Sequence, residues 1–275
     1  MTLVIGCRWL FRDSDGILIT SDSKVTTSLG ITYEMRKVYP IQLDDERPIA
    51  IAGVAGDTSL AKKGVETAEE VLLRFAEDTY PIEQNRFKVA VREIERQLIQ
   101  HFSELRRYGI DPSFQMILGS VDLEGRGSLY LFDSRGLSEP VHDNPGYAII
   151  GSGMVTGGIL LLRLIGFDSR LDLGLLSAFI VDSVSEVDSS VGAFIGDSFL
   201  MRVEEINDKR RIVVGPLKTD VLIKYKDQIK ARREIVKKMW KLCDELGEEK
   251  IFEILSNVER ELKNSVIQDN STKSR

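Results

Sequence analysis

The stretch TLVIGCRWLFRDSDGILITSDSKV, residues 2–25, decides the fold of this chain. Residues 2–10 and 17–25 are rich in apolar and β-branched side chains, and Asp-Ser-Asp-Gly at residues 13–16 lies between them. Two apolar runs joined by turn residues are typical of a β-hairpin. The sequence therefore predicts a chain that enters a β-sheet at its very start.

Strands and helices are expected in alternating blocks along the rest of the chain. Helices are indicated by apolar residues that recur at spacings of three and four, with Asp57 as the cap of the first helix. Blocks of antiparallel strands between pairs of helices predict an α+β fold, with two sheets packed between two helix layers in the order αββα. The expected elements are strands 37–43 and 48–54, two helices ending near residues 75 and 107, strands 114–121, 129–132 and 147–150, helices 151–165 and 173–187, and a hairpin of 194–203 and 210–214 joined at Asn207-Asp208.

The composition is that of an ordinary globular protein. The 275 residues include 37 Lys and Arg against 43 Asp and Glu, a formal net charge of −6, and this argues against general nucleic-acid binding. Cys7 and Cys243 are too few for a disulfide framework, and no CxxC pair offers a zinc site. The sequence shows neither a signal peptide nor an apolar run long enough to span a bilayer, so we expect a cytoplasmic protein without membrane association.

Histidine chemistry has little support in this sequence. Its two histidines are His101, on an expected helix, and His142, in a polar turn. Neither has a Cys, Asp or Glu nearby at a spacing that suits metal ligation. We therefore expect both to be structural, and we expect no metal and no cofactor.

The character of the chain changes at Pro216. Residues 1–215 are the predicted main domain, and residues 216–275 are the predicted helical extension, with Leu222, Ile229, Val236 and Cys243 every seven residues. The extension carries a net charge of +3 and the rest −9, and basic residues concentrate in 224–241. This basic segment is either a solvated helix face or a surface that docks an acidic protein partner or the negative core of a neighbouring subunit.

Thr2 stands directly after the initiator methionine. Methionine is normally removed when a small residue follows, and the new chain would begin with a threonine that carries both a hydroxyl and a free α-amino group. A terminal amine has a pKa of about 8, so it can act as a base near neutral pH. Such a nucleophile works without a histidine.

Several motifs resemble the proteasome β subunit family of N-terminal nucleophile (Ntn) hydrolases. The resemblance extends over about residues 2–205, in the family's order. Each motif is weak alone, and together they are specific. They are residues 2–6, 16–26, 36–41, Ile49-Ala-Ile-Ala-Gly-Val-Ala-Gly-Asp57, 109–121, Asp133-Ser-Arg-Gly136, 148–153 and Asp188-Ser-Ser-Val-Gly192.

The resemblance implies a threonine peptidase that acts on peptides or unfolded proteins, and a homo-oligomer in which a ring is possible. An acyl ester on the threonine would be hydrolysed by water. The implied catalytic residues are Thr2 as nucleophile, Asp22 and Lys37 as a buried pair that lowers the pKa of the threonine hydroxyl, Gly53 as oxyanion donor, and Ser152 and Asp188 around the amine. The implied substrate-binding residues are Val25, Met35, Ile51 and Ala55 in an apolar pocket and Thr26 along the peptide backbone.

Structural explanations stand beside these roles. If these residues have only structural roles, Asp22 and Lys37 form an ordinary ion pair, and Gly53 is needed for close packing. Ser152 and Asp188 then cap helices. The sequence also departs from the family pattern at Val191, where serine is usual, at Lys24, where arginine is commoner, and in a longer first hairpin. The alternatives are a non-catalytic scaffold or interaction protein, an acyl-transferring transpeptidase or ligase, and a small-amide hydrolase.

Overall fold

The computed structural model describes residues 2–11, 14–26 and 32–272, with the backbone alone for residues 25, 26, 32 and 261–272. The chain divides into two compact units, Met1–Leu222 and Ile223–Arg275. The prediction that a catalytic domain ends at residue 215 and an extension begins at residue 216 stays a prediction.

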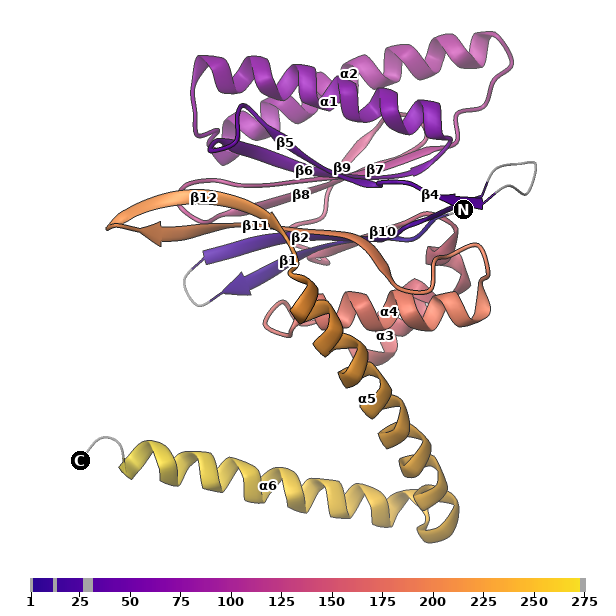
Figure 1. Ribbon diagram of the computed structural model, residues 1–275, viewed down its shortest axis with the longest axis vertical. Coiled ribbons are helices and arrows are strands. Elements are labelled where there is room, and N and C mark those ends of the chain that lie inside the picture. Colours follow the sequence, from indigo (N-terminus) through magenta and orange to yellow (C-terminus); the bar gives the residue numbers. More distant parts are fainter. Residues whose placement is uncertain (1, 12–13, 27–31, 273–275) are drawn as a thin grey trace. The chain divides into compact units, whose positions relative to one another are not determined.

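The first unit has four layers (Figure 1). One five-stranded sheet has the order β10-β1-β2-β11-β12, and we call it the N-terminal sheet; the second sheet has the order β5-β6-β7-β8-β9. Helices α1 and α2 cover the second sheet, and α3 and α4 cover the N-terminal sheet. The predicted αββα arrangement is confirmed. The strands are β1 (Val4–Phe11), β2 (Ser14–Asp22), β3 (Lys24–Thr26), β4 (Thr32–Glu34), β5 (Val38–Gln42), β6 (Pro48–Gly56), β7 (Phe114–Val121), β8 (Gly127–Phe132), β9 (Ser138–Pro140), β10 (Tyr147–Ile150), β11 (Ile195–Ile206) and β12 (Lys209–Pro216).

The helices follow from local sequence signals. Asp57 caps α1 as expected, because its Oδ1 accepts hydrogen bonds from the backbone N–H groups of Ser59 and Leu60 at 2.9 and 3.3 Å. In the described part of the chain, no helix is both long and apolar enough to cross a membrane. The helices are α1 (Thr58–Asp78), α2 (Gln84–Arg107), a π-helical turn (Met154–Gly158), α3 (Ile159–Ile165), α4 (Leu173–Val187), α5 (Thr219–Leu246) and α6 (Glu248–Thr272).

The second strand of the first hairpin begins and ends three residues earlier than the expected range 17–25, at Ser14 and Asp22. Strands β1 and β2 pair from Val4 opposite Ser21 to Phe11 opposite Ser14, so the last three residues of the expected turn belong to β2. The remainder of that turn lies outside the described residues. Alternate residues of both strands face the second sheet, where Val4, Ile17 and Ile19 join the apolar cluster between the sheets.

Three local features differ from the expected elements. The short ribbon β3-β4 and the strand β9 have three residues each, too few to give a periodic pattern in the sequence. The helix expected over 151–165 begins instead with a π-helical turn, because Gly157 adopts φ 155° and interrupts regular helix. The last hairpin is confirmed: Asn207 and Asp208 have φ of 53° and 59°, as a type I′ turn requires.

The second unit consists of most of α5 followed by α6. Gly247 separates the two helices and has φ 81°, a conformation that glycine adopts readily at a helix end. Tyr225, Ile229 and Ile251 are buried, whereas much of the remaining apolar surface of both helices is exposed.

Candidate active site

A fully buried ion pair forms the centre of the candidate site. The Lys37 Nζ lies 2.8 Å from Asp22 Oδ1, and the two side chains are 2% and 0% exposed. The ammonium also donates to the carbonyl oxygen of Lys24 at 2.5 Å. Strand β2 ends at Asp22, and Lys37 directly precedes β5, so the pair connects the two sheets.

The Asp22 carboxylate connects the pair to the residue after Thr2. Its Oδ1 accepts the Leu3 N–H at 2.8 Å, and the Leu3 carbonyl accepts the Asp22 N–H at 3.1 Å. Its Oδ2 accepts the N–H groups of Gly192 and Lys24 at 2.8 and 3.1 Å. This one carboxylate therefore joins four segments of the chain, around residues 3, 22–24, 37 and 192.

The electrostatic state of Lys37 differs from that of a surface lysine. Burial lowers the pKa of its ammonium, and the attraction of Asp22 and Asp197 opposes that shift. Asp197 also accepts the backbone N–H of Lys37 at 2.9 Å. The site thus holds an ion pair in a poorly hydrated place, where electrostatic interactions are stronger than in water.

The turn at residues 151–153 holds the backbone of Thr2. The Thr2 nitrogen donates to Ser152 Oγ at 3.3 Å, and the Gly153 N–H donates to the Thr2 carbonyl at 3.2 Å. Gly151 has φ 89°, and a Cβ atom there would lie 2.1 Å from the Thr2 carbonyl oxygen. Only glycine fits so close to this backbone. The nitrogen that would become the free amine is therefore already directed at Ser152.

Asp188 is connected to this turn through a residue that the sequence analysis missed. Thr156 Oγ1 lies 3.0 Å from Asp188 Oδ2 and 3.4 Å from the Ser152 carbonyl. Asp188 also ends α4, which fits the structural role considered for it, whereas Ser152 accepts no capping hydrogen bond at the start of the π-helical turn. Burial raises the pKa of Asp188, but hydrogen bonds from Ser190 and Thr156 outweigh it and lower the pKa overall.

The hydroxyl expected near Asp188 comes from the neighbour of Val191. Val191 is buried in the apolar cluster that contains Leu3. Ser190 donates to Asp188 Oδ1 from its backbone N–H at 2.9 Å and also from its hydroxyl. The serine hydroxyl lost at residue 191 therefore has a counterpart one residue earlier.

The predicted oxyanion donor and the predicted substrate-binding residues differ in burial and in what surrounds them. A Cβ atom on Gly53 would lie 2.7 Å from Ile19 and 2.8 Å from Val4, so close packing between the sheets is sufficient reason for a glycine. Its role as oxyanion donor stays a prediction. Ile51 and Ala55 are buried in the cluster between the sheets, and Met35 is half-buried. The side chains of the other two, Val25 and Thr26 in β3, lie outside the described part of the structure.

A cavity of about 760 Å³ opens beside Thr2. Among the described residues, its lining includes none of Met35, Ile51 and Ala55. Gln115 fixes one wall, because its Oε1 accepts the Gly151 N–H at 2.9 Å. No motif in the sequence singles out Gln115, which follows the first residue of β7. The lining is Thr2, 56–57, 111–115, 133–134, 151–152, Met154 and Val155.

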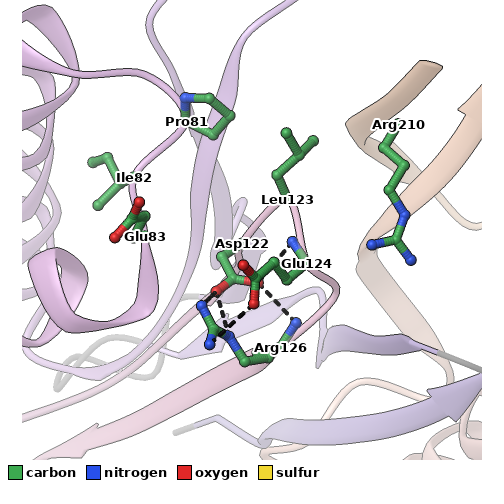
Figure 2. Close-up of a pocket in the computed structure, with 8 residues that line it drawn as sticks. All are labelled: Pro81, Ile82, Glu83, Asp122, Leu123, Glu124, Arg126 and Arg210. Atoms are coloured by element: carbon green, nitrogen blue, oxygen red, sulfur yellow. Dashed lines mark hydrogen bonds and ion pairs between the residues drawn. The ribbon is translucent and has the colours of Figure 1, made fainter.

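A second cavity, of about 310 Å³, contains no residue of the candidate site (Figure 2). Asp122 lies at its base, 2.7 Å from Arg126, and accepts the N–H groups of Glu124 and Arg126. Arg210 of β12 lies on the opposite side. These contacts close the turn between β7 and β8. In the described part of the chain, no group of His, Cys, Asp and Glu side chains is arranged to hold a metal.

Comparison with known proteins identifies the family. A family model described as proteasome subunit matches residues 11–160, more than half of the chain. The chain belongs to the proteasome subunit family. Its fold is that of the proteasome-like Ntn hydrolases, as the motifs of the sequence suggest.

Solved structures show the same proteasome-like fold at low sequence identity. An Anbu (Gly-1) mutant from Hyphomicrobium sp. strain MC1 is 17% identical, with a TM-score of 0.64 over 88% of this chain and 97% of that chain. Anbu, an ancestral beta-subunit, from Yersinia bercovieri is 16% identical, with a TM-score of 0.63 over 87% and 96%. Eukaryotic HslV from Trypanosoma brucei is 18% identical, with a TM-score of 0.52 over 72% and 98%. No curated protein gives a significant match to the sequence.

Proposed function

We propose that this member of the proteasome subunit family is a threonine peptidase whose nucleophile is Thr2, exposed by removal of Met1. The observation that carries the proposal is the buried pair of Asp22 and Lys37, hydrogen-bonded to the residue that follows Thr2. An almost fully buried ion pair is expensive to bury, and a chemical role explains why it lies beside Leu3, the residue after Thr2.

The proposed reaction proceeds through an acyl ester. The Thr2 hydroxyl oxygen attacks a peptide carbonyl carbon, and its proton passes to the freed α-amine. The Lys37 ammonium stabilises the developing alkoxide, and the Gly53 N–H is the proposed donor to the oxyanion. The C–N bond then breaks, and the leaving amine takes the proton. Water, activated by the same α-amine, hydrolyses the ester and restores Thr2.

The proposal extends to the surroundings of this reaction. The substrate is a peptide or an unfolded protein, bound as an added strand along Thr26, with an apolar preference set by Val25, Met35, Ile51 and Ala55. Ser152 and Asp188 orient the amine. The protein acts in the cytoplasm as a homo-oligomer, with a ring as one possible form, and needs no cofactor. Residues 1–215 form the catalytic domain, and 216–275 the extension.

Intact mass and N-terminal sequencing test the first requirement. Purified protein should begin with Thr2, because a retained Met1 would block the amine and overturn the proposal. An electrophilic peptide with an epoxyketone should then add its mass to the wild type. Thr2→Ala should take up no label, and Thr2→Ser should be labelled, since it keeps both the hydroxyl and the amine.

A non-catalytic role is the second candidate, and Val191 favours it, since it lacks the hydroxyl that the family usually places there. A chain with an exposed Thr2 and no labelling would support this scaffold role. If labelling occurs, a peptide substrate with and without an added amine separates hydrolysis from acyl transfer. Cleavage of a small amide but of no peptide would instead indicate a small-amide hydrolase.

A further inference from the structure

Lys37 is bound by carboxylates from two different strands, one at its side chain and one at its backbone. The ammonium lies 2.8 Å from Asp22 Oδ1 at the end of β2, and the backbone N–H donates to Asp197 Oδ2 of β11 at 2.9 Å. Lys37 directly precedes β5 of the second sheet, whereas β2 and β11 belong to the N-terminal sheet. Both contacts therefore join the two sheets, and only the first belongs to the proposed reaction.

An irregularity in the pairing of β11 determines where Asp197 lies. Ile195 pairs with Asp22 of β2, and Asp197 pairs with the residue before Asp22, so Gly196 is an extra residue in β11. Such a β-bulge changes the direction of the side chains beside it, and bulges are common next to active sites. A Cβ atom on Gly196 would lie 2.4 Å from the Cβ atom of Ser23, so the bulge has no room for a larger residue. The bulge thus brings a second carboxylate close to Asp22 on the neighbouring strand.

The residue before Lys37 is held against the same strand by a separate contact. The Arg36 Cζ atom lies over the ring of Phe199 in β11 and over the ring of Tyr39 in β5, at 5.1 and 5.6 Å from the ring centroids. A guanidinium at this distance is attracted to the face of an aromatic ring. The Tyr39 hydroxyl also donates to the Arg36 carbonyl at 2.7 Å. The start of β5 is thus held against β11 at two neighbouring residues.

The two carboxylates also act on the charge of Lys37. Burial lowers the pKa of its ammonium, and the negative charges of Asp22 and Asp197 oppose that shift. Two cations close by have other partners, since the Lys24 ammonium donates to a backbone carbonyl and Arg36 lies over aromatic rings. Removal of the charge of Asp197 is therefore expected to lower the pKa of Lys37.

We propose that Asp197 is a positioning residue for the peptidase reaction. It holds the backbone of Lys37 and thereby aims the ammonium at Asp22, beside the residue that follows Thr2. The side chain of lysine is a flexible stem of four carbons, so a shift of the backbone is passed on to the ammonium. A displacement of about 1 Å at a catalytic group lowers a rate by up to about a hundredfold. This role rests on the proposed function of Thr2.

Two variants separate the hydrogen bond of Asp197 from its charge. Asp197→Asn keeps an oxygen that accepts the Lys37 N–H and removes the negative charge, whereas Asp197→Ala removes both. Labelling by an epoxyketone peptide is measured as the maximal rate and as the affinity of the initial complex. Asp197→Ala should lower the maximal rate about tenfold or more and leave the affinity unchanged, because the proposed peptide contacts do not involve Asp197.

Asp197→Asn should recover most of the maximal rate at neutral pH. Toward alkaline pH it should lose labelling earlier than the wild type, because Lys37 then gives up its proton more easily. NMR titration of isotope-labelled lysine, assigned with Lys37→Met, measures the pKa of Lys37 directly and without any reaction at Thr2. Asp197→Asn should lower that pKa relative to the wild type.

Asp15→Asn is the matched control. Asp15 of β2 is likewise a carboxylate of the N-terminal sheet that accepts a backbone N–H of the second sheet, from Gly127 at 2.8 Å. This variant should keep the maximal rate, the pH dependence of labelling and the pKa of Lys37. Urea unfolding of all three variants ensures that labelling is compared only where each protein is folded.

The outcomes distinguish this role from the peptidase proposal. A wild type that takes no label would refute the peptidase proposal, and the role of Asp197 with it. If the wild type is labelled and folded Asp197→Ala reaches the same maximal rate, Asp197 has no positioning role while the peptidase proposal stands. A lower affinity at an unchanged maximal rate would overturn the role as well. Slow labelling of Asp197→Asn at a pH where NMR shows Lys37 still charged would mean that the hydrogen bond does not aim the ammonium.

Discussion

Lys37→Met tests whether the buried pair supports both the fold and the proposed chemistry. Methionine keeps most of the length of the lysine and removes the charge, so the Asp22 carboxylate loses its ion pair with Lys37. Breaking a buried ion pair from one side costs about 3–5 kcal/mol, because the remaining charge is left in a place without water.

The contacts around Asp22 place the expected loss at the lower end of that range. Three backbone N–H groups, from Leu3, Lys24 and Gly192, still donate to the carboxylate at 2.8 to 3.1 Å. These three hydrogen bonds remain in the variant and continue to stabilise the carboxylate. We therefore expect Lys37→Met to lower the free energy of unfolding by about 3 kcal/mol, and to abolish labelling by an epoxyketone under conditions where the variant is folded.

Urea unfolding, followed by far-ultraviolet circular dichroism, measures the first effect, and intact mass measures the second. Arg8→Met is the matched control, since Arg8 pairs with the buried Asp15 at 3.0 Å in the same sheet but is 32% exposed. This control should lose about 1 kcal/mol and keep labelling. A loss below about 1 kcal/mol for Lys37→Met would refute the reasoning on the buried charge. Undiminished labelling of folded Lys37→Met would refute the proposed role of the ammonium.

Three further predictions concern parts of the first unit. Burial raises the pKa of Cys7 from 9.0 to about 12, so above pH 9 the unfolded chain loses a proton that the folded chain keeps. The free energy of unfolding of the wild type, relative to that of Cys7→Ala, should therefore fall by about 1.4 kcal/mol between pH 8 and pH 10. Urea titrations in which the two proteins show the same pH dependence would contradict this. Gly53→Ala should destabilise by about 1–3 kcal/mol through contact with the opposite sheet, whereas Gly215→Ala, where an added Cβ meets nothing within 4 Å, should be close to neutral in the same urea titration. Asp57→Ala should lower the thermal midpoint through the loss of about 1 kcal/mol of helix capping, and an unchanged midpoint would mean that the cap contributes nothing.

The layered fold could be predicted because its signals are local. The turn at Asn207 and Asp208 has side chains that tolerate positive φ, and Asp57 stands where an N-cap belongs, so these element boundaries follow from the sequence without any knowledge of packing. Where the signal was short, prediction failed. The strand β9 contains three residues, and the pairing that defines it comes from β8, which the sequence around it does not reveal.

The types of the candidate-site residues and their order in the sequence were enough to predict which residues gather there. The hydrogen bonds that join them to other segments could not be predicted. Asp22 and Lys37 were expected to pair, and they do. Thr156 and Gln115 were missed, because each acts through a hydrogen bond to a turn that is distant in sequence. No pattern along one chain encodes such contacts, since they arise when helix, strand and turn meet in three dimensions.

The surroundings of Asp22 also bear on how inactive variants should be interpreted. This carboxylate fixes Leu3, Lys24, Lys37 and Gly192 at once, and the turn at 151–153 fixes Thr2 by its backbone. Because the same contacts hold the fold and aim the candidate nucleophile, loss of labelling carries mechanistic meaning only when the variant is still folded. Replacement of Ser190 by alanine is a cleaner probe, since its part-buried hydroxyl donates to Asp188, whereas the Asp22 carboxylate is held in this segment by the backbone N–H of Gly192. Reduced labelling of folded Ser190→Ala would show that this residue performs the task that the family usually gives to the serine at residue 191.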